Sequence, residues 1–148
     1  MRPLEASDAS FCASIHGKCF AHSWSSCEIE TMTTSANSIA HAAVDGRAGG
    51  VLGFIISRKV LDEAEVLTIA VDPEYRRQGV AAALLEVHLS AMAMDRVRHL
   101  FLEVDQANVP AKALYARFGF VEKGRREGYY RTEDGNRATA LIMRKDVI

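Results

Sequence analysis

Residues 69–85 read IAVDPEYRRQGVAAALL, a stretch in which a strand ends, a loop follows and a helix begins. The strand is a β-rich run from Glu65 to Val71, and the proline that comes two residues later cannot continue a strand ladder. Over residues 80–94, apolar side chains recur at steps of three and four, which predicts an amphipathic helix from about Arg77 to Met94. A strand that leads through a short loop into such a helix is typical of an α/β fold.

The loop of this stretch has the features of an anion-binding site. The first turn of a helix has backbone N–H groups without partners and lies at the positive end of the helix dipole. Gly79 lets the backbone approach a ligand closely, and Arg76 and Arg77 add positive charge. The loop matches neither GxxxxGKS/T nor GxGxxG, which disfavours a nucleoside triphosphate or a dinucleotide. A helix that simply begins after a glycine and exposed arginines is the alternative, and these residues alone leave both interpretations open.

Two helices are expected ahead of this stretch. Ser7 is a candidate N-cap for the first helix. The second begins where Ser25 and Glu28 fit a capping box, and Trp24 and Ile29 occupy the positions of a hydrophobic staple around that box. Both helices therefore have a start signal in the sequence.

The rest of the chain combines strand patterns with one more helix. This helix follows Asn108, a candidate N-cap, with Pro110 in its first turn and Gly119 just past its end. The glycine-rich stretch DGRAGG at residues 45–50 has the size of a hairpin turn. Strands are expected over residues 2–5, 38–44, 51–60, 99–105, 120–123 and 138–145. The order of the elements predicts a mixed α/β sheet with helices on its faces.

Length and composition limit the class of protein. The chain of 148 residues has room for one domain, residues 1–148, and its 49% apolar and 25% charged residues are typical of a globular protein. A net charge of −1 gives no electrostatic basis for binding nucleic acid or an anionic membrane. The longest apolar runs have six residues, too few to span a bilayer, and the acidic N-terminal stretch does not fit a secretory signal. We therefore expect a cytoplasmic protein.

One cluster of cysteine and histidine residues is a candidate metal site. Cys12, His16 and Cys19 fall on one face of the first helix, and His22 follows closely. A zinc site needs four ligands that converge on one point, which a single straight helix rarely supplies. The alternative is two small buried thiols on an apolar stripe with a histidine at its edge. We expect no metal.

Two blocks of the sequence resemble the GCN5-related N-acetyltransferase (GNAT) family. The pattern Val71-x4-Arg76-x2-Gly79-x-Ala81 is similar to the acyl-CoA signature Q/R-x-x-G-x-G/A of that family, and residues 108–120, NVPAKALYARFGF, resemble its N-x-x-A-x-x-L-Y-x-x-x-G-F block. The blocks have the right order and separation, and the resemblance extends over essentially the whole chain. Within the family it is strongest to the bacterial ribosomal-protein alanine N-acetyltransferases of the RimI type.

Two positions depart from the family's pattern. Ser23 stands where a proline often precedes the tryptophan, and Ala81 stands in place of the second glycine of the signature. The first departure concerns the wall of the acceptor site, and neither departure threatens cofactor binding.

The resemblance implies a fold and an acetyl-CoA site. The fold is a mixed, mostly antiparallel sheet of about six to seven strands with about four helices. The backbone of three residues at the end of the strand 65–71 would hydrogen-bond the pantetheine arm. The backbone N–H groups of the following loop and of the first helical turn would hold the pyrophosphate. These positions are Ile69, Ala70 and Val71 for the arm and Arg77, Gln78, Gly79, Val80, Ala81 and Ala82 for the pyrophosphate. Asn108 would contact the cofactor near its thioester, although an N-cap role explains the same residue.

The resemblance also implies an acid and a base. Glu103 is the candidate base, on the same strand face as Phe101 and Asp105, and a solvated strand carboxylate is the alternative. Near pH 7 the neutral amine costs about 1.4 kcal/mol for an α-amine and about 4.6 kcal/mol for a lysine, so an N-terminal amine is the easier acceptor. Tyr115 is the candidate acid, with a core tyrosine beside Leu114 as the alternative. A hydrogen bond to the departing thiolate describes its role better than complete proton transfer.

The acceptor site is expected on aromatic residues. Tyr129 and Tyr130 are interpreted as part of a loop between two strands that lays a peptide over the sheet, and Phe20 and Trp24 as the opposite wall. Aromatic packing at the base of a hairpin, and the helix staple for Trp24, are the alternatives. The charges of this loop are interpreted as a solvated face: Arg125, Arg126, Glu127 and Arg131.

The predicted function is N-α-acetylation of a protein N-terminus that begins with a small residue, by analogy the alanine of a small-subunit ribosomal protein. No serine, cysteine or lysine shows the signature of an acyl-enzyme, so we expect direct attack in a ternary complex. The oxyanion would need an N–H donor, which a bulged end of the strand 65–71 could provide. A lysine or small-molecule N-acetyltransferase and an acyl-CoA-binding regulatory module are the alternatives.

Overall fold

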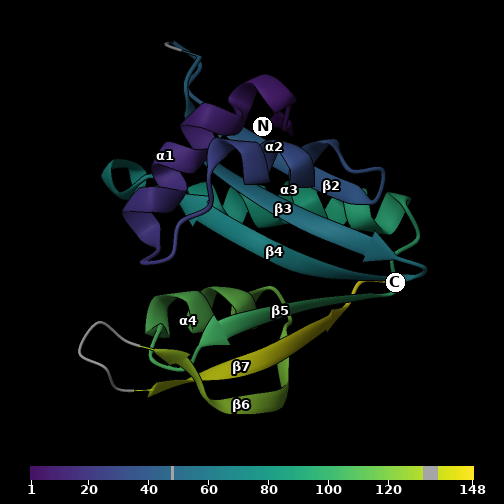
Figure 1. Cartoon of the computed structure of the whole chain (residues 1–148). Helices are drawn as coiled ribbons and strands as arrows, with labels where there is room; N and C mark the ends of the chain where they lie inside the picture. The colour runs from purple at the N-terminus through teal and green to yellow at the C-terminus, as the bar shows by residue number, and fades with distance from the viewer. Residues whose placement is uncertain (48, 132–136) are drawn as a thin grey trace.

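The computed structural model describes residues 1–47, 49–131 and 137–148 of the chain (Figure 1). One sheet of seven strands runs through it in the order β1-β2-β3-β4-β5-β7-β6. The strands are β1 (Arg2–Pro3), β2 (Ser38–Val44), β3 (Val51–Val60), β4 (Glu63–Val71), β5 (His99–Asp105), β6 (Val121–Arg131) and β7 (Arg137–Asp146). The α-helices are α1 (Ala9–Cys19), α2 (Ser26–Thr34), α3 (Val80–Met94) and α4 (Val109–Arg117). The expected mixed and mostly antiparallel sheet with four helices is therefore confirmed.

The sheet opens between β4 and β5. Every other neighbouring pair of strands is antiparallel, whereas β4 and β5 run parallel and pair only over residues 63–65 and 99–101. Beyond these pairs the two strands diverge, and Figure 1 shows β1 to β4 separating from β5, β7 and β6. The edge of β4 that faces β5 therefore carries no strand ladder over residues 66–71.

A bulge interrupts β4 just where this opening begins. Ile56 of β3 pairs with Thr68, but the next residue, Ser57, pairs with Val66, so that Leu67 is an extra residue without a partner in β3. A bulge of this kind leaves the extra residue outside the ladder and bends its strand. It lies in the interior of β4, and not at the end of the strand as we expected from the sequence.

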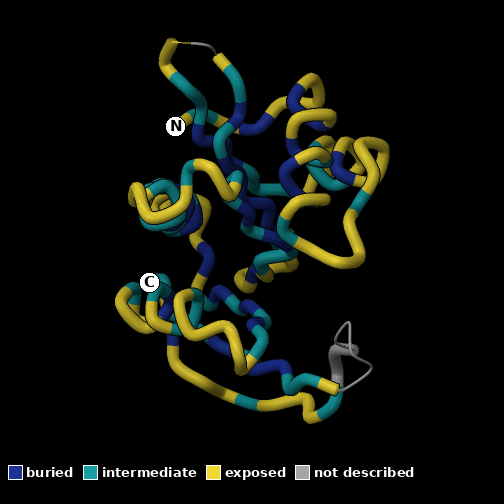
Figure 2. The backbone as a smooth tube through the Cα atoms, turned by 90° about the vertical axis from the view of Figure 1, so that its left-hand side faces the viewer, coloured by how far each residue is buried: buried dark blue, intermediate teal, exposed yellow. Residues whose placement is uncertain are grey.

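Helices cover both faces of the sheet and define two apolar clusters. On one face α1 and α2 bury Cys12, Ile15 and Ile29 against β3, and on the other α3 and α4 pack against β2, β3 and β5 (Figure 1). Figure 2 shows that burial follows the strands through the middle of the molecule, while the outer surfaces of the helices and the connecting turns are exposed. Within the described residues, no helix has both the length and the apolar character needed to span a bilayer.

The hairpin of β2 and β3 and the strand β5 have the bounds that the sequence predicts, whereas the helix starts differ at two places. The predicted N-cap Ser7 is wrong, because a 3-10 turn over Ala6–Asp8 precedes α1 and the Asp8 carboxylate accepts a hydrogen bond of 2.9 Å from the N–H of Glu5. Helix α3 begins at Val80, because Arg77 has a left-handed φ of 61° that no helix tolerates.

The strand β6 is longer than predicted. It continues to Arg131, so the backbone of Tyr129 and Tyr130 belongs to a strand and not to a loop, which corrects the expected loop. A register shift between Arg126 and Tyr130 marks a further bulge on the way. The side chains of both tyrosines lie outside the described part of the structure.

Candidate active site

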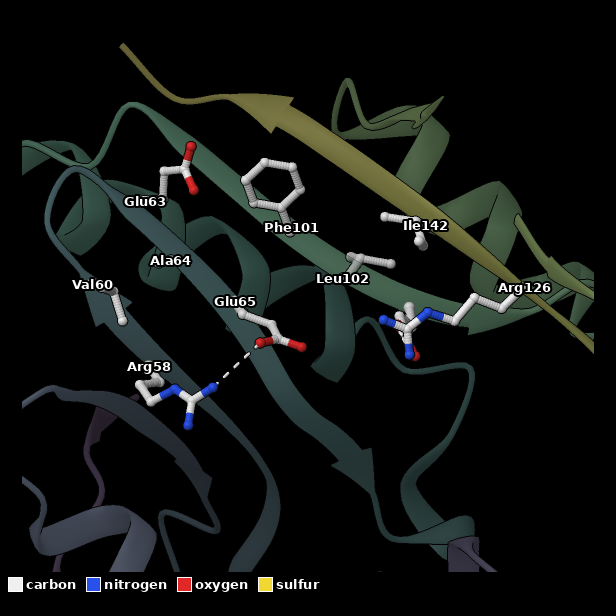
Figure 3. A pocket seen from close by; sticks show the side chains of 10 residues that line it. Arg58, Val60, Glu63, Ala64, Glu65, Phe101, Leu102, Arg126 and Ile142 are labelled. Atoms are coloured by element: carbon white, nitrogen blue, oxygen red, sulfur yellow. Dashed lines mark ion pairs between the residues drawn. The ribbon is translucent and has the colours of Figure 1, made fainter. Parts of the chain in front are cut away.

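A pocket of about 290 Å³ lies at the point where β4 and β5 begin to separate (Figure 3). Residues of five strands line it: Arg58, Val60, Glu63, Ala64, Glu65, Phe101, Leu102, Glu103, Arg126 and Ile142. Apolar side chains form its floor, and carboxylates and guanidinium groups stand around them. A concave pocket in which five apolar and five charged side chains converge is a candidate for a binding site.

Glu103 is held in this pocket by the alternation of β5. Leu100, Leu102 and Val104 are buried in the cluster under α3 and α4, so the intervening Glu103 points to the other face of the sheet. Its side chain is 25% exposed, and its carboxylate Oε1 lies 3.4 Å from Nη1 of Arg126 in β6. The predicted base therefore lines a pocket.

The ion pair with Glu103 adds a contact to the interpretation of Arg126. The sequence pattern placed Arg125 and Arg126 on a solvated face, and both side chains are about half exposed, but Arg125 pairs with Glu122 at 2.6 Å whereas Arg126 pairs with Glu103. Arg126 pairs with Ala140 of β7, which in turn pairs with Asp105 of β5, so its side chain emerges on the face that carries Glu103. The sequence could not reveal this contact, because it depends on the register of three strands.

The start of α3 presents free N–H groups, as expected for an anion site. Gly79 is the N-cap in a left-handed conformation with φ 76°, and the first helical bond runs from the N–H of Ala83 to the carbonyl of Gly79 at 3.0 Å. The N–H groups of Val80, Ala81 and Ala82 therefore have no partner within the helix. A side chain added at Gly79 would meet no atom within 4 Å, so the space above this turn is open.

The end of α1 is tied to the loop before α3. The Cys19 thiol donates to the carbonyl of Val71 at 3.4 Å and accepts from Nη2 of Arg76 at 3.3 Å. Beside it, Lys18 forms an ion pair with Asp72 at 3.2 Å. These contacts fix the carboxyl end of β4 and the arginine of the signature relative to α1. Among the described residues, no three His, Cys, Asp or Glu side chains are grouped so that they could hold a metal ion.

The candidate acid is buried beneath the sheet. Tyr115 of α4 belongs to the cluster of Leu102 and Val104 and stacks edge-on against Phe120, with 5.7 Å between ring centroids. Burial raises the pKa of Tyr115 to about 12. Tyr115 and Glu103 thus approach β5 from opposite faces of the sheet. Asn108 caps α4 by accepting from the N–H of Ala111 at 3.2 Å, which realises its predicted structural role.

The structure does not bring Phe20 and Trp24 into the pocket of Glu103. His16 lies between them, with 4.6 Å between its ring centroid and that of Trp24 and 4.4 Å to that of Phe20, and its Nδ1 accepts from the N–H of Trp24 at 3.1 Å. Burial lowers the pKa of His16, so the neutral ring that accepts this bond is favoured. This aromatic cluster lies at the end of α1, and its Trp24 packs against the buried apolar cluster that includes Ile29.

Thr68 is a buried polar residue on the sheet face of Glu103 that the sequence analysis missed. It is buried one residue after the bulge of β4, and its Oγ1 has no hydrogen-bond partner among the described residues. Its strand partner Ile56 faces α1 and α2, so Thr68 points to the same sheet face as Glu103. A threonine inside a strand is unremarkable as a sequence feature, and only the missing partner distinguishes it.

Comparison with known proteins identifies the class to which this fold and site belong. Residues 9–120 match the model of the Acetyltransferase (GNAT) family, and the chain therefore belongs to that family. Over 95 residues it is 46% identical to the ribosomal protein bS18-alanine N-acetyltransferase of Escherichia coli. That match covers 64% of each chain, so the chain spans less than two thirds of the length of this curated relative.

Solved structures share the fold over nearly the full chain. The crystal structure of the ribosomal-protein-S18-alanine N-acetyltransferase from Escherichia coli gives a TM-score of 0.91 at 35% identity, and the match covers 98% of this chain and 91% of that chain. The Arabidopsis thaliana protein NAA60 in complex with acetyl-CoA gives a TM-score of 0.84 at 24% identity, with 98% and 96% covered. The second likeness is one of fold.

Proposed function

We propose that this protein is an acetyl-CoA-dependent N-α-acetyltransferase that acts on a protein N-terminus beginning with a small residue. The observation that carries the proposal is Glu103, a carboxylate in a pocket at the divergence of β4 and β5. Strand β4 lines part of this pocket, and the same strand leads through a loop to the start of α3, where the backbone N–H groups are free. The family and the names of the chain's relatives support acetyl as the transferred group and an N-terminal alanine as the acceptor.

The residues present fit acetyl-CoA as the acyl donor. The unpaired edge of β4 at Ile69, Ala70 and Val71 offers backbone groups to a pantetheine arm in the manner of an added strand. The N–H groups of the next turn are suited to a diphosphate, and the residues that would hold it are Arg77, Gln78, Gly79, Val80, Ala81 and Ala82. Asn108, at the start of α4, would add a polar contact.

When bound, this donor supplies an acetyl group activated as a thioester. Glu103 would accept a proton from the acceptor ammonium and pass it to water, and the neutral nitrogen would then form a bond to the carbonyl carbon while the carbon–sulfur bond breaks. The nitrogen would lose a second proton as the amide forms, and through water this proton would reach the departing thiolate. Tyr115 donates a hydrogen bond to the departing sulfur. With a pKa of about 12, complete transfer of its proton to a thiolate of pKa about 8.5 would be uphill by about 5 kcal/mol, so Tyr115 keeps its proton.

The bulge of β4 supports a role in stabilising negative charge. Because Leu67 opposes no residue of β3, its N–H is not engaged in that ladder and is available to the carbonyl oxygen as negative charge develops there. We place the oxyanion donor at this residue. Direct attack in a ternary complex needs no protein nucleophile.

Three classes of amine distinguish the proposed function from its alternatives. An N-α-acetyltransferase of the alanine type acts on a lysine-free peptide with a free N-terminal alanine. A lysine enzyme acts on an N-terminally blocked peptide with one lysine, and a small-molecule enzyme on a polyamine. The contribution of Tyr129, Tyr130, Phe20 and Trp24 to holding the acceptor stays part of this proposal.

The test is the release of CoA thiol from acetyl-CoA with each acceptor in turn. We expect turnover with the free N-terminal alanine peptide and less than about a tenth of that rate with the others, because their amines have higher pKa values. Preference for the lysine peptide or the polyamine would replace the proposed acceptor class. Binding of acetyl-CoA without thiol release in any arm would identify a regulatory module instead of an enzyme.

A further inference from the structure

Arg126 places a permanent positive charge beside the carboxylate of Glu103. Its Nη1 lies 3.4 Å from Oε1 of Glu103, and both side chains line the same pocket. Figure 3 shows the guanidinium of Arg126 extending from β6 toward the space between β5 and β4. The Arg126 side chain is 51% exposed, so an acceptor that enters the pocket meets it.

The geometry sets how close an acceptor nitrogen comes to this charge. A nitrogen that donates to Oε1 of Glu103 at about 2.9 Å lies no farther than about 6 Å from Nη1 of Arg126. A guanidinium is not deprotonated in proteins, so its charge is present at every pH of interest. Two like charges at this distance repel, and the acceptor can relieve the repulsion by losing a proton.

The other charges on this face of the sheet have partners of their own. Arg58 of β3 pairs with Glu65 of β4 at 3.6 Å, and Arg144 of β7 with Asp146 at 3.3 Å. The acidic groups that face the pocket or share its side of the sheet are Glu63, Glu65, Glu103 and Asp105. Within the described part of the chain, Arg126 is the cationic side chain that forms an ion pair with the Glu103 carboxylate within 4 Å.

We propose that Arg126 is a further functional residue of the acceptor site, which favours the neutral, nucleophilic form of the bound acceptor amine. The inference rests on the proposed function, because it needs an amine that attacks from the pocket of Glu103. The proton of the ammonium passes to Glu103 and from there to water, while Arg126 forms no covalent bond and transfers no proton. The charge of Arg126 opposes binding of the acceptor as an ammonium and favours the loss of a proton from that ammonium.

The test is the pH dependence of kcat and the KM for an N-terminal alanine peptide in three variants. Arg126→Gln removes the charge, Arg126→Lys retains it, and Arg58→Gln removes a like charge from the same pocket. For Arg126→Gln we expect the pH of half-maximal kcat to rise by about half to one unit and KM at neutral pH to fall. We expect Arg126→Lys to keep most of the wild-type profile, and Arg58→Gln to shift it by less than Arg126→Gln does.

A purely structural role for Arg126 would lower activity without moving the pH profile, and this result would overturn the proposal. An equal shift in Arg58→Gln would also overturn it, because the effect would then come from the charge of the pocket as a whole. The wild-type rate with the alanine peptide tests the proposed function separately. If the wild type prefers another amine, the profiles are measured with that amine, and the shift with Arg126→Gln is still expected.

Discussion

Tyr115 is a buried phenol whose environment limits what it can do. It sits among apolar side chains under the sheet, and this burial raises its pKa to about 12. At neutral pH the hydroxyl therefore keeps its proton and acts as a hydrogen-bond donor. A donor that is aimed at developing charge stabilises the transition state more than the bound substrates.

We expect Tyr115→Phe to lower kcat by about 10²-fold or more while the Kd for acetyl-CoA stays within about twofold. The ring packing against Phe120 is retained in this variant, so the loss isolates the hydroxyl. Steady-state kinetics and calorimetric titration with acetyl-CoA measure the two quantities. An unchanged kcat would exclude Tyr115 from the mechanism.

At the scale of single residues, the sequence was informative where a role follows from local spacing. Asn108 and Ser25 act as the caps that their positions indicate, and Glu103 occupies the predicted face of its strand. Arg126 and Thr68 could not be predicted, because their roles depend on the register of β6 and on the bulge of β4. Neither the register of β6 nor the bulge of β4 can be recognised from the local sequence.

The start of α3 is the element that we propose to bind the diphosphate of the cofactor. Gly79 holds a left-handed φ of 76°, which directs the chain from the loop into the helix and leaves the first N–H groups free. Because a side chain there would meet no atom within 4 Å, a substitution changes the stability of the unliganded protein through the backbone conformation alone. This isolates the conformational cost from any steric effect.

We expect Gly79→Ala to lower the free energy of unfolding by about 1 kcal/mol and to weaken acetyl-CoA binding by up to about tenfold. Gly50→Ala is the matched control, because a side chain at Gly50 also meets no atom within 4 Å and its φ lies outside the left-handed region. Urea unfolding and calorimetric titration provide the measurements. Equal behaviour of the two variants would show that the left-handed turn is dispensable.

The bounds of the elements also show what the local pattern can and cannot predict. The hairpin over residues 38–60 was predicted from its alternation and its glycine-rich turn. Helix α3 was predicted to begin too early, because apolar periodicity does not report the φ of Arg77. Strand β6 was predicted too short, because its polar residues Glu122, Arg125 and Arg126 are held in the strand by their pairing with β7 and not by a pattern of their own.

At the scale of the whole molecule, a buried chain of polar groups links the sheet to α3. Nδ1 of His88 lies 2.8 Å from Nδ1 of His41 in β2, and Nε2 of His88 lies 2.7 Å from Oγ of Ser57 in β3. Burial, with a smaller contribution from His41, lowers the pKa of His88 to about 3. Burial also lowers the pKa of His41. The folded protein therefore holds both rings neutral.

This arrangement makes the protein less stable in mild acid. Below about pH 6.5 the unfolded chain binds a proton at His88, whereas the folded chain does not until about pH 3. The free energy of unfolding therefore falls with pH in this window, by up to about 1.4 kcal/mol per pH unit for each such histidine. We expect urea unfolding between about pH 7.5 and pH 5 to show this loss.

In His88→Gln we expect a shallower loss of stability toward acid, even if this variant is less stable at neutral pH. The exposed His22 offers a matched control, and His22→Gln should give a curve parallel to that of the wild type. If the curve of His88→Gln were parallel as well, the buried histidines would not account for the acid sensitivity.

The fold class, the cofactor turn and the two catalytic candidates were accessible from the sequence. The geometry that makes them a site was not, because it arises from the divergence of β4 and β5. Their parallel pairing stops after residues 65 and 101, and only this opening leaves Glu103 in a pocket between strands that are far apart in the chain. Such long-range pairing has no counterpart in a local pattern.

The most direct test of the proposed mechanism is the rate of Glu103→Gln with an N-terminal alanine peptide between about pH 7 and pH 9.5. Glutamine keeps the shape of the side chain but cannot accept the proton. We expect kcat to fall by about 10²-fold or more near pH 7 and to recover in part at the alkaline end, where the acceptor amine is neutral without help. A Glu103→Gln enzyme that matches the wild type at every pH would contradict the role of Glu103 as the base.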